Sequence, residues 1–153
     1  MFGLLKRKAE NFFSEKEKEK VLHAIQETER NTSGEVRVFV ESHCRFVDAI
    51  DRAAEIFYSL KMDATEQHNA VLVYVAMKDR QLAIFADDGI YKKAGTAFWK
   101  EEVTKMLQHF NKENYADGIA TIVREIGDSL HTHFPYDAST DKNELPDDIV
   151  FGK

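Results

Sequence analysis

Residues 70–77 read "AVLVYVAM", and the chain continues with "KDR" at 78–80 and "QLAIFA" at 81–86. The first run is β-branched and apolar at both odd and even positions, which is typical of a strand covered on both faces. Only three polar residues separate the two runs, too few for a crossover helix, so the pattern predicts an antiparallel hairpin. This hairpin is the centre of the predicted fold.

Residues 35–41, "EVRVFVE", alternate between valines and other side chains, which is the period of a strand. Apolar residues at helical spacing predict a helix over about residues 47–61, between this strand and residues 70–77. Because a helix joins them, the two strands should be parallel and the crossover right-handed. Residues 81–86 then add an antiparallel third strand.

Three more helices are predicted around this sheet. Ser14 and Glu17 have the S-x-x-E spacing of a capping box, which starts a helix that ends at about Asn31. Apolar residues at helical spacing predict two further helices, over about residues 96–112 and 115–133. The order of the elements predicts an α/β fold, a small mixed β-sheet sandwiched between helices on both faces. Its layers are Rossmann-like, but no Walker-type loop and no G-x-G-x-x-G motif follows a strand.

The length of 153 residues is enough for one domain with a real core. We expect a leader over residues 1–11 and an α/β domain over residues 12–135. An acidic tail should follow over residues 136–153, and its apolar residues suggest that it docks on the domain.

The composition is ordinary for a soluble globular protein, with 43% hydrophobic and 31% charged residues. A net charge of −6 argues against nucleic acid or an anionic membrane as the main partner. Cys44 is the only cysteine, which excludes an intrachain disulfide. The longest apolar run is too short to span a bilayer, and Lys6, Arg7 and Lys8 interrupt any secretory leader. We expect a cytoplasmic monomer without membrane insertion that works with an unidentified protein partner.

Acidic residues gather at the edge of the predicted sheet where the two parallel strands begin and the third strand ends. Three loops that are distant in sequence meet there. Carboxylate oxygens are the ligands that Ca²⁺ and Mg²⁺ prefer in proteins, so this edge predicts a site for one of these cations. The predicted metal ligands are Asp87, Asp88, Glu35 and Asp63.

The opposite edge of the sheet is less acidic and has a basic neighbour, Arg80. A second candidate metal site there would use Glu41, Asp48 and Asp79. A simpler interpretation of the first edge stays open as well. Asp tolerates turn conformations and glycine closes them, so residues 87–89, "DDG", also fit an ordinary turn.

Several stretches resemble the TPM-domain family, which is named from thylakoid-lumen, photosystem-repair and receptor-modulating members. They are "NTSGEVRVFVE", "HNAVLVYVAMKDRQLAIFADDGI", "FWKEEVTKML", "FNKENYADGI" and "NELPDDIVFG". The resemblance covers roughly residues 12–152 and points to the soluble, stand-alone bacterial branch. It implies an α/β/α sandwich and acidic loops that bind calcium or magnesium in some members. One departure is Ala86, which stands where the family usually has glycine.

The resemblance leaves two functions open. Acid phosphatase activity is claimed for a plant member, whereas other members look like non-enzymatic assembly or modulator proteins. The first hypothesis for this chain is a divalent-cation-binding module with a non-catalytic role in assembly, stress or maintenance. The alternative is a metal-dependent phosphatase that uses a metal-activated water. The residues favour the binding module, because they offer no dedicated clamp of cationic groups for a phosphate.

Overall fold

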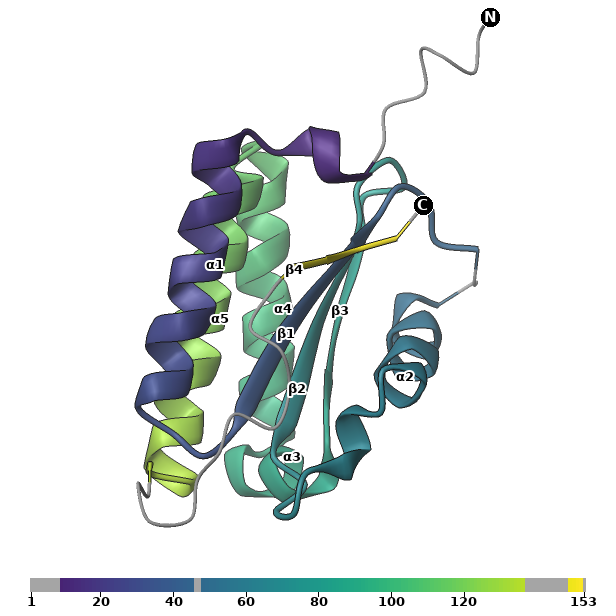
Figure 1. The fold of residues 1–153 in the computed structure, drawn as a ribbon. Helices are drawn as coiled ribbons and strands as arrows, with labels where there is room; N and C mark the ends of the chain where they lie inside the picture. The colour runs from purple at the N-terminus through teal and green to yellow at the C-terminus, as the bar shows by residue number, and fades with distance from the viewer. Residues whose placement is uncertain (1–8, 46–47, 137–148, 153) are drawn as a thin grey trace, which may run out of the picture.

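A mixed four-stranded sheet forms the centre of the computed structural model, which describes residues 9–45, 48–136 and 149–152 (Figure 1). The strands are β1 (Glu35–Glu41), β2 (Ala70–Ala76), β3 (Gln81–Ala86) and β4 (Ile149–Phe151), in the order β3-β2-β1-β4. β1 is parallel to β2 and to β4, and β3 is antiparallel to β2. The predicted parallel pairing of β1 with β2 and the predicted β2–β3 hairpin are therefore confirmed.

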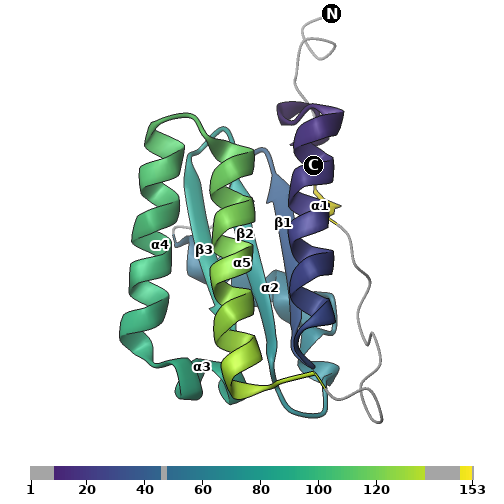
Figure 2. The same ribbon diagram turned by 90° about the vertical axis from the view of Figure 1, so that its left-hand side faces the viewer.

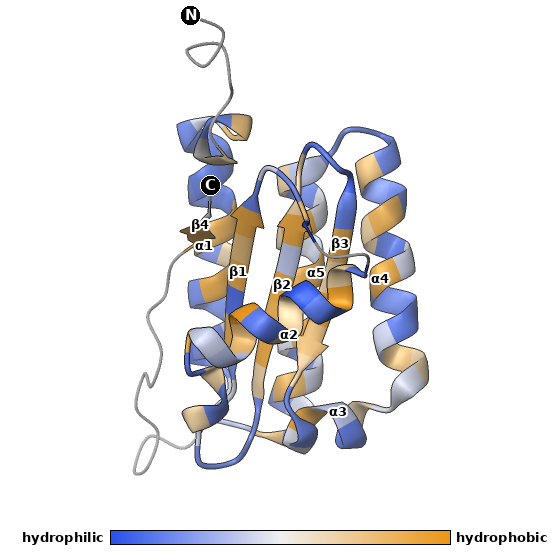
Figure 3. Cartoon of the chain, turned by 90° about the vertical axis from the view of Figure 1, so that its right-hand side faces the viewer, coloured by the Kyte–Doolittle hydropathy of each residue, from blue (hydrophilic) through white to orange (hydrophobic). Residues whose placement is uncertain are grey.

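Helices cover both faces of this sheet, as the α/β prediction requires (Figures 2 and 3). One face carries α1 (Glu15–Arg30), α4 (Thr96–Asn111) and α5 (Tyr115–His133), and the other carries α2 (Ala49–Ser59). A short helix, α3 (Asp88–Ala94), lies at the edge of the sheet where β3 ends. Two 3₁₀ turns, η2 (Ala9–Phe12) and η3 (Met62–Ala64), complete the described elements.

Each face of the sheet has its own hydrophobic core. The valines of β1 and β2 pack toward α1 and α5 with residues such as Ile25 and Ile126. The alternate residues of the same strands, among them Phe39 and Tyr74, pack toward Phe57 of α2. Every residue of β2 is buried, so this strand is the covered central strand that its sequence predicted.

Local sequence signals account for several helix ends. The capping box of α1 is present in full, because the Ser14 hydroxyl accepts from the Glu17 amide and the Glu17 carboxylate accepts from the Ser14 amide. α5 begins and ends at the predicted residues, and α4 ends one residue earlier than predicted. In the described ranges, no helix combines the length and the apolar character that crossing a membrane requires.

Two elements were not predicted as such, α3 and β4. β4 pairs with residues 38–40 of β1, and the Gly152 amide donates to the Val40 carbonyl at 2.7 Å. The end of the predicted tail therefore does contact the sheet. Three predicted stretches lie outside the described residues: residues 137–148 and 153 of the tail, residues 1–8 of the leader, and the expected start of α2 at residue 47.

Candidate functional site

Asp87 follows β3 directly and is the N-cap of α3. Its extended backbone lets one side-chain oxygen, Oδ1, accept from the Asp88 amide at 2.8 Å. Its other oxygen, Oδ2, lies 3.2 Å from Nδ1 of His68. The side chain is nearly buried, at 7% exposure for the residue. The stretch "DDG", which also fitted an ordinary turn, therefore starts a helix, and Asp87 occupies the N-cap position that Asp favours.

Gly89 explains why a glycine follows the two aspartates. A Cβ atom at this position would overlap the carbonyl oxygens of Gln67 and His68. The first turn of α3 therefore packs directly on the backbone of the loop that leads into β2, and the Ile90 amide donates to the His68 carbonyl at 3.2 Å. The glycine serves a close backbone approach here, because its φ is not in the left-handed region.

Glu35 and Asp87 lie on either side of the first residue of β2. Glu35 is paired with Ala70 in the parallel register, and the Asp87 amide donates to the Ala70 carbonyl at 3.0 Å. Glu35 is 3% exposed. The three-loop convergence predicted from topology is therefore present, and it brings two buried carboxylates to the same edge of the sheet.

Asn69 directly precedes Ala70, the strand residue that Glu35 and Asp87 flank, and it is buried. Its carbonyl accepts from the Glu35 amide at 3.3 Å, and its side-chain amide donates to the Ser33 hydroxyl at 3.3 Å. Its side-chain oxygen, Oδ1, is buried and has no hydrogen-bond partner in the ranges that the structure describes. Buried oxygens in proteins are usually paired with a protein group or a water.

The other two predicted ligands lie differently. Asp88 is the first residue of α3 and is exposed, and Asp63 is exposed on η3. Across the described parts of the chain, no group of three or more His, Cys, Asp and Glu side chains is arranged to hold a metal ion. A cation at this edge would therefore need oxygens from amide, hydroxyl, carbonyl or water in addition to the carboxylates, which Ca²⁺ and Mg²⁺ accept.

At the opposite edge of the sheet, Glu41 forms a salt bridge with Arg52. Both of its oxygens accept from the Arg52 guanidinium, at 2.8 and 2.9 Å, and the Tyr74 hydroxyl donates to the same carboxylate. The hydrogen bond to Glu41 raises the pKa of Arg52 above its usual range, and burial does the same for the pKa of Tyr74. This bidentate pair makes Glu41 a structural anchor between β1, β2 and α2.

The other two residues of this second candidate site, Asp79 and Asp48, have different surroundings. Asp79 accepts from the Cys44 amide at 2.6 Å and lies 2.9 Å from Nδ1 of His43, so it ties the β2–β3 turn to the end of β1. The hydrogen bond with His43, more than that with the Cys44 amide, lowers the pKa of Asp79. Asp48 is the exposed N-cap of α2 and makes no side-chain capping bond.

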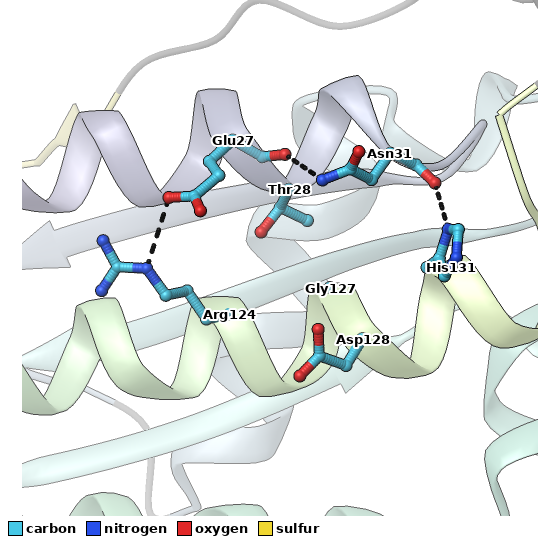
Figure 4. A pocket seen from close by; sticks show the side chains of 7 residues that line it. All are labelled: Glu27, Thr28, Asn31, Arg124, Gly127, Asp128 and His131. Atoms are coloured by element: carbon cyan, nitrogen blue, oxygen red, sulfur yellow. Dashed lines mark hydrogen bonds and ion pairs between the residues drawn. The ribbon is translucent and has the colours of Figure 1, made fainter.

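A polar groove of about 300 Å³ lies between α1 and α5, on the helical face of the molecule (Figure 4). Glu27 and Arg124 form an ion pair of 3.6 Å across it, and His131 contacts the Asn31 carbonyl at 2.7 Å. Gly127 at its floor lets the two helices approach, because a Cβ there would overlap the Thr28 side chain. Two carboxylates, Glu27 and Asp128, and one guanidinium, Arg124, line the groove, and Arg124 is already paired with Glu27.

Comparison with known proteins decides the family. The sequence profile of the TPM domain matches residues 7–129. The chain belongs to the TPM domain family. The predicted resemblance to that family is thereby confirmed, over most of the chain. A comparison with curated protein sequences gives no significant match.

Solved structures show the same TPM-domain architecture. The BA42 protein of the psychrophilic bacterium Bizionia argentinensis, known from NMR, is 35% identical in sequence, with a TM-score of 0.84 over 92% of this chain and 96% of that one. The N-terminal domain of the cg2496 protein of Corynebacterium glutamicum has a TM-score of 0.62 at 14% identity, over 88% of this chain and 80% of that one. An N-terminal domain from P. gingivalis has a TM-score of 0.68 at 14% identity, over 82% and 83%. The last two likenesses concern the fold alone.

The metal ligands predicted from the sequence did not include Asn69, which the sequence shows as one polar residue in the loop before β2. Its unpaired oxygen depends on burial between loops that are far apart in sequence, which no local pattern reports. The sequence signal that was available is its position: a carboxamide directly before a wholly apolar strand, at the edge where Glu35 begins the neighbouring strand.

Proposed function

We propose that this TPM domain binds a hard divalent cation, Ca²⁺ or Mg²⁺, at the edge of the sheet where β1 and β2 begin, and that its role is non-catalytic. The observation that carries the proposal is the buried Asn69 Oδ1 without a hydrogen-bond partner in the described ranges, at the same edge of the sheet as the buried residues Glu35 and Asp87. Together they offer one amide and two carboxylate oxygens, a donor set that suits these cations.

The proposal revises the predicted ligand set. Glu35 and Asp87 stay as ligands and Asn69 joins them, whereas Asp88 and Asp63 have exposed side chains and take no ligand role. When bound, the cation would neutralise two buried carboxylates and tie the starts of β1 and β2 to the start of α3. The predicted role in assembly, stress or maintenance through a protein partner fits a module that an ion makes more rigid.

Thermal unfolding with and without calcium or magnesium tests the proposal. A ligand that binds only the folded state raises its stability, by about 2.7 kcal/mol when its concentration is a hundred times the dissociation constant. Asp87→Asn should abolish this rise while leaving the metal-free melting temperature close to that of the wild type, because Asn is as good an N-cap as Asp.

The matched control is Asp88→Asn, which removes the same charge one residue further along, from an exposed position. It should keep the full metal-induced rise. Two results would contradict the proposal: no rise in the wild type with either cation, or an undiminished rise in Asp87→Asn. A rise that is lost in Asp79→Asn instead would move the site to the opposite edge.

One observation favours the alternative, a metal-dependent phosphatase. Arg37 shares a face of β1 with Glu35, and its half-buried guanidinium has a buried Nε without a hydrogen-bond partner in the described ranges. A guanidinium with an Nε that lacks a hydrogen-bond partner in the described ranges is a suitable group for a phosphate oxygen. Hydrolysis of p-nitrophenyl phosphate that depends on the added cation, and that is lost in both Asp87→Asn and Arg37→Gln, would favour the enzyme over the binding module.

A further inference from the structure

Glu102 is a buried carboxyl group on α4, far in sequence from the strand edge described above. It is 3% exposed, and its Oε2 has no hydrogen-bond partner in the described parts of the chain. Burying an ionised carboxylate is costly unless it is paired with a cation and hydrogen-bonded. The position therefore favours a neutral, protonated side chain.

The surroundings of Glu102 strengthen this preference. Lys105, one turn further along α4, lies 4.0 Å from the Glu102 carboxyl group but 2.9 Å from that of Glu125 on α5 and 3.6 Å from that of Glu101. One ammonium group is thus shared by three carboxyl groups. The three carboxylates repel each other, and one ammonium group cannot compensate all of them. A proton bound to one of the carboxylates lowers this repulsion.

The other elements packed against α4 do not change this balance. β3 has no charged residue along its length. α3 carries Asp88, Lys92 and Lys93, and none of them forms an ion pair with Glu102 in the described ranges. The charged groups that act on Glu102 are therefore Lys105 and Glu101 on its own helix and Glu125 on α5.

We propose that the contact between α4 and α5 is a pH-sensitive joint, closed while Glu102 holds a proton that it shares with Glu125 and loosened when that proton leaves. The inference is independent of the proposed cation site, because the joint and the strand edge share no residue. A single residue, Gly95, connects α4 to α3. A change in the position of α4 would therefore act on α3, the helix that Asp87 caps.

Burial, followed by the hydrogen bond and the charge of Glu125, raises the pKa of Glu102 to about 8, and Lys105 opposes this only in part. A raised pKa in the folded state gives stability that is fully present below the ordinary pKa of 4.5 and is lost as the pH rises to about 8. Across this window the unfolding equilibrium constant should rise by about tenfold per pH unit from this one proton.

The test is chemical unfolding of the full chain at a series of pH values from 4.5 to 9, together with amide hydrogen exchange. In the wild type we expect the denaturant concentration at the unfolding midpoint to fall as the pH rises. We also expect the α4 amides to lose protection from hydrogen exchange before those of β2. Glu102→Gln keeps the neutral shape without the titrating proton, so this contribution to the pH slope should disappear and the variant should exceed the wild type at pH 8.

Glu101→Gln is the matched control, because it removes the same charge from a side chain that is 68% exposed on the same helix. Glu101 has the smallest influence on Glu102 among the charged groups named above, so this variant should keep nearly all of the pH slope of the wild type. An unchanged slope in Glu102→Gln would overturn the proposal. If that variant does not fold, the ¹³C carboxyl signals of the wild-type glutamates decide the matter: titration of Glu102 near its ordinary pKa would overturn the proposal, and titration well above it would support it.

Discussion

Gly89 is fixed by the space around it rather than by its backbone angles. The first turn of α3, which contains Gly89, lies on the carbonyl groups of Gln67 and His68, so Asp87, two residues before Gly89, is held beside the start of β2. Asp87 in turn is used as a helix cap and as a partner of His68. Two residues thus shape the candidate site. Gly89 permits the close contact between α3 and the loop before β2, and Asp87 caps α3 and pairs with His68.

This arrangement predicts that Gly89→Ala destabilises the protein even though alanine is the better helix former. Overpacking of this kind typically costs about 1–3 kcal/mol, and backbone carbonyl groups cannot swing aside as a side chain can. Urea unfolding measures the loss. Asp88→Ala, at the exposed neighbouring position, should stay close to the wild type, and a Gly89→Ala variant of wild-type stability would show that the loop at 67–68 yields.

At the scale of the elements, the stability of α1 depends on its N-terminal cap, and the stability of β2 depends on the burial of its side chains. The capping box satisfies two amides at the start of α1, where the intrahelical bonds have not yet begun. β2 has helices over both of its faces and a strand on either side, so each of its side chains lies in one of the two cores. These two elements should respond to substitution very differently.

Replacing the N-cap residue of α1 should cause a modest loss of stability. Ser14→Ala removes the acceptor of the Glu17 amide and should lower the free energy of unfolding by about 1 kcal/mol. A double-mutant cycle with Glu17→Ala separates the reciprocal bond from the two single effects. Additive losses would contradict the coupled capping box that the structure shows.

Replacing a residue of β2 by a charged one should abolish folding. Val73 is fully buried, and an unpaired buried carboxylate costs several kcal/mol, on the order of the stability of a whole domain. Val73→Asp should therefore be insoluble or unfolded by circular dichroism. Tyr58→Asp, at a position that is 54% exposed on α2, is the matched control and should melt cooperatively.

Elements with a long or strongly periodic pattern could be predicted from the sequence, and the two short ones could not. α5 has nineteen residues with one continuous buried stripe, which fixes its ends. α3 has only seven residues and begins with Asp and Gly, so it shows no helical period and resembles a turn. β4 has three residues whose partner, β1, lies about a hundred positions earlier, and such a pairing leaves no local signal.

At the scale of the whole molecule, topology decides where chemistry can occur. Because β1 and β2 are parallel and β3 returns, loops from three distant parts of the chain meet at one edge of the sheet. That convergence could be predicted from element order, and so could the presence there of Glu35 and Asp87. Which acidic side chains turn inward could not, because it depends on caps and close contacts: Asp88 begins a helix and Asp63 lies on an exposed turn.

The central claim is that this edge binds a divalent cation through Glu35, Asn69 and Asp87, and a calcium titration followed by ¹H–¹⁵N NMR tests it most directly. We expect saturable shifts confined to the amides of residues 33–36, 67–70 and 86–90, together with the Asn69 side-chain amide, and the same pattern with magnesium at higher concentration. No saturable shift with either cation, or shifts confined to residues 41–48 and 76–80 at the opposite edge, would contradict the claim.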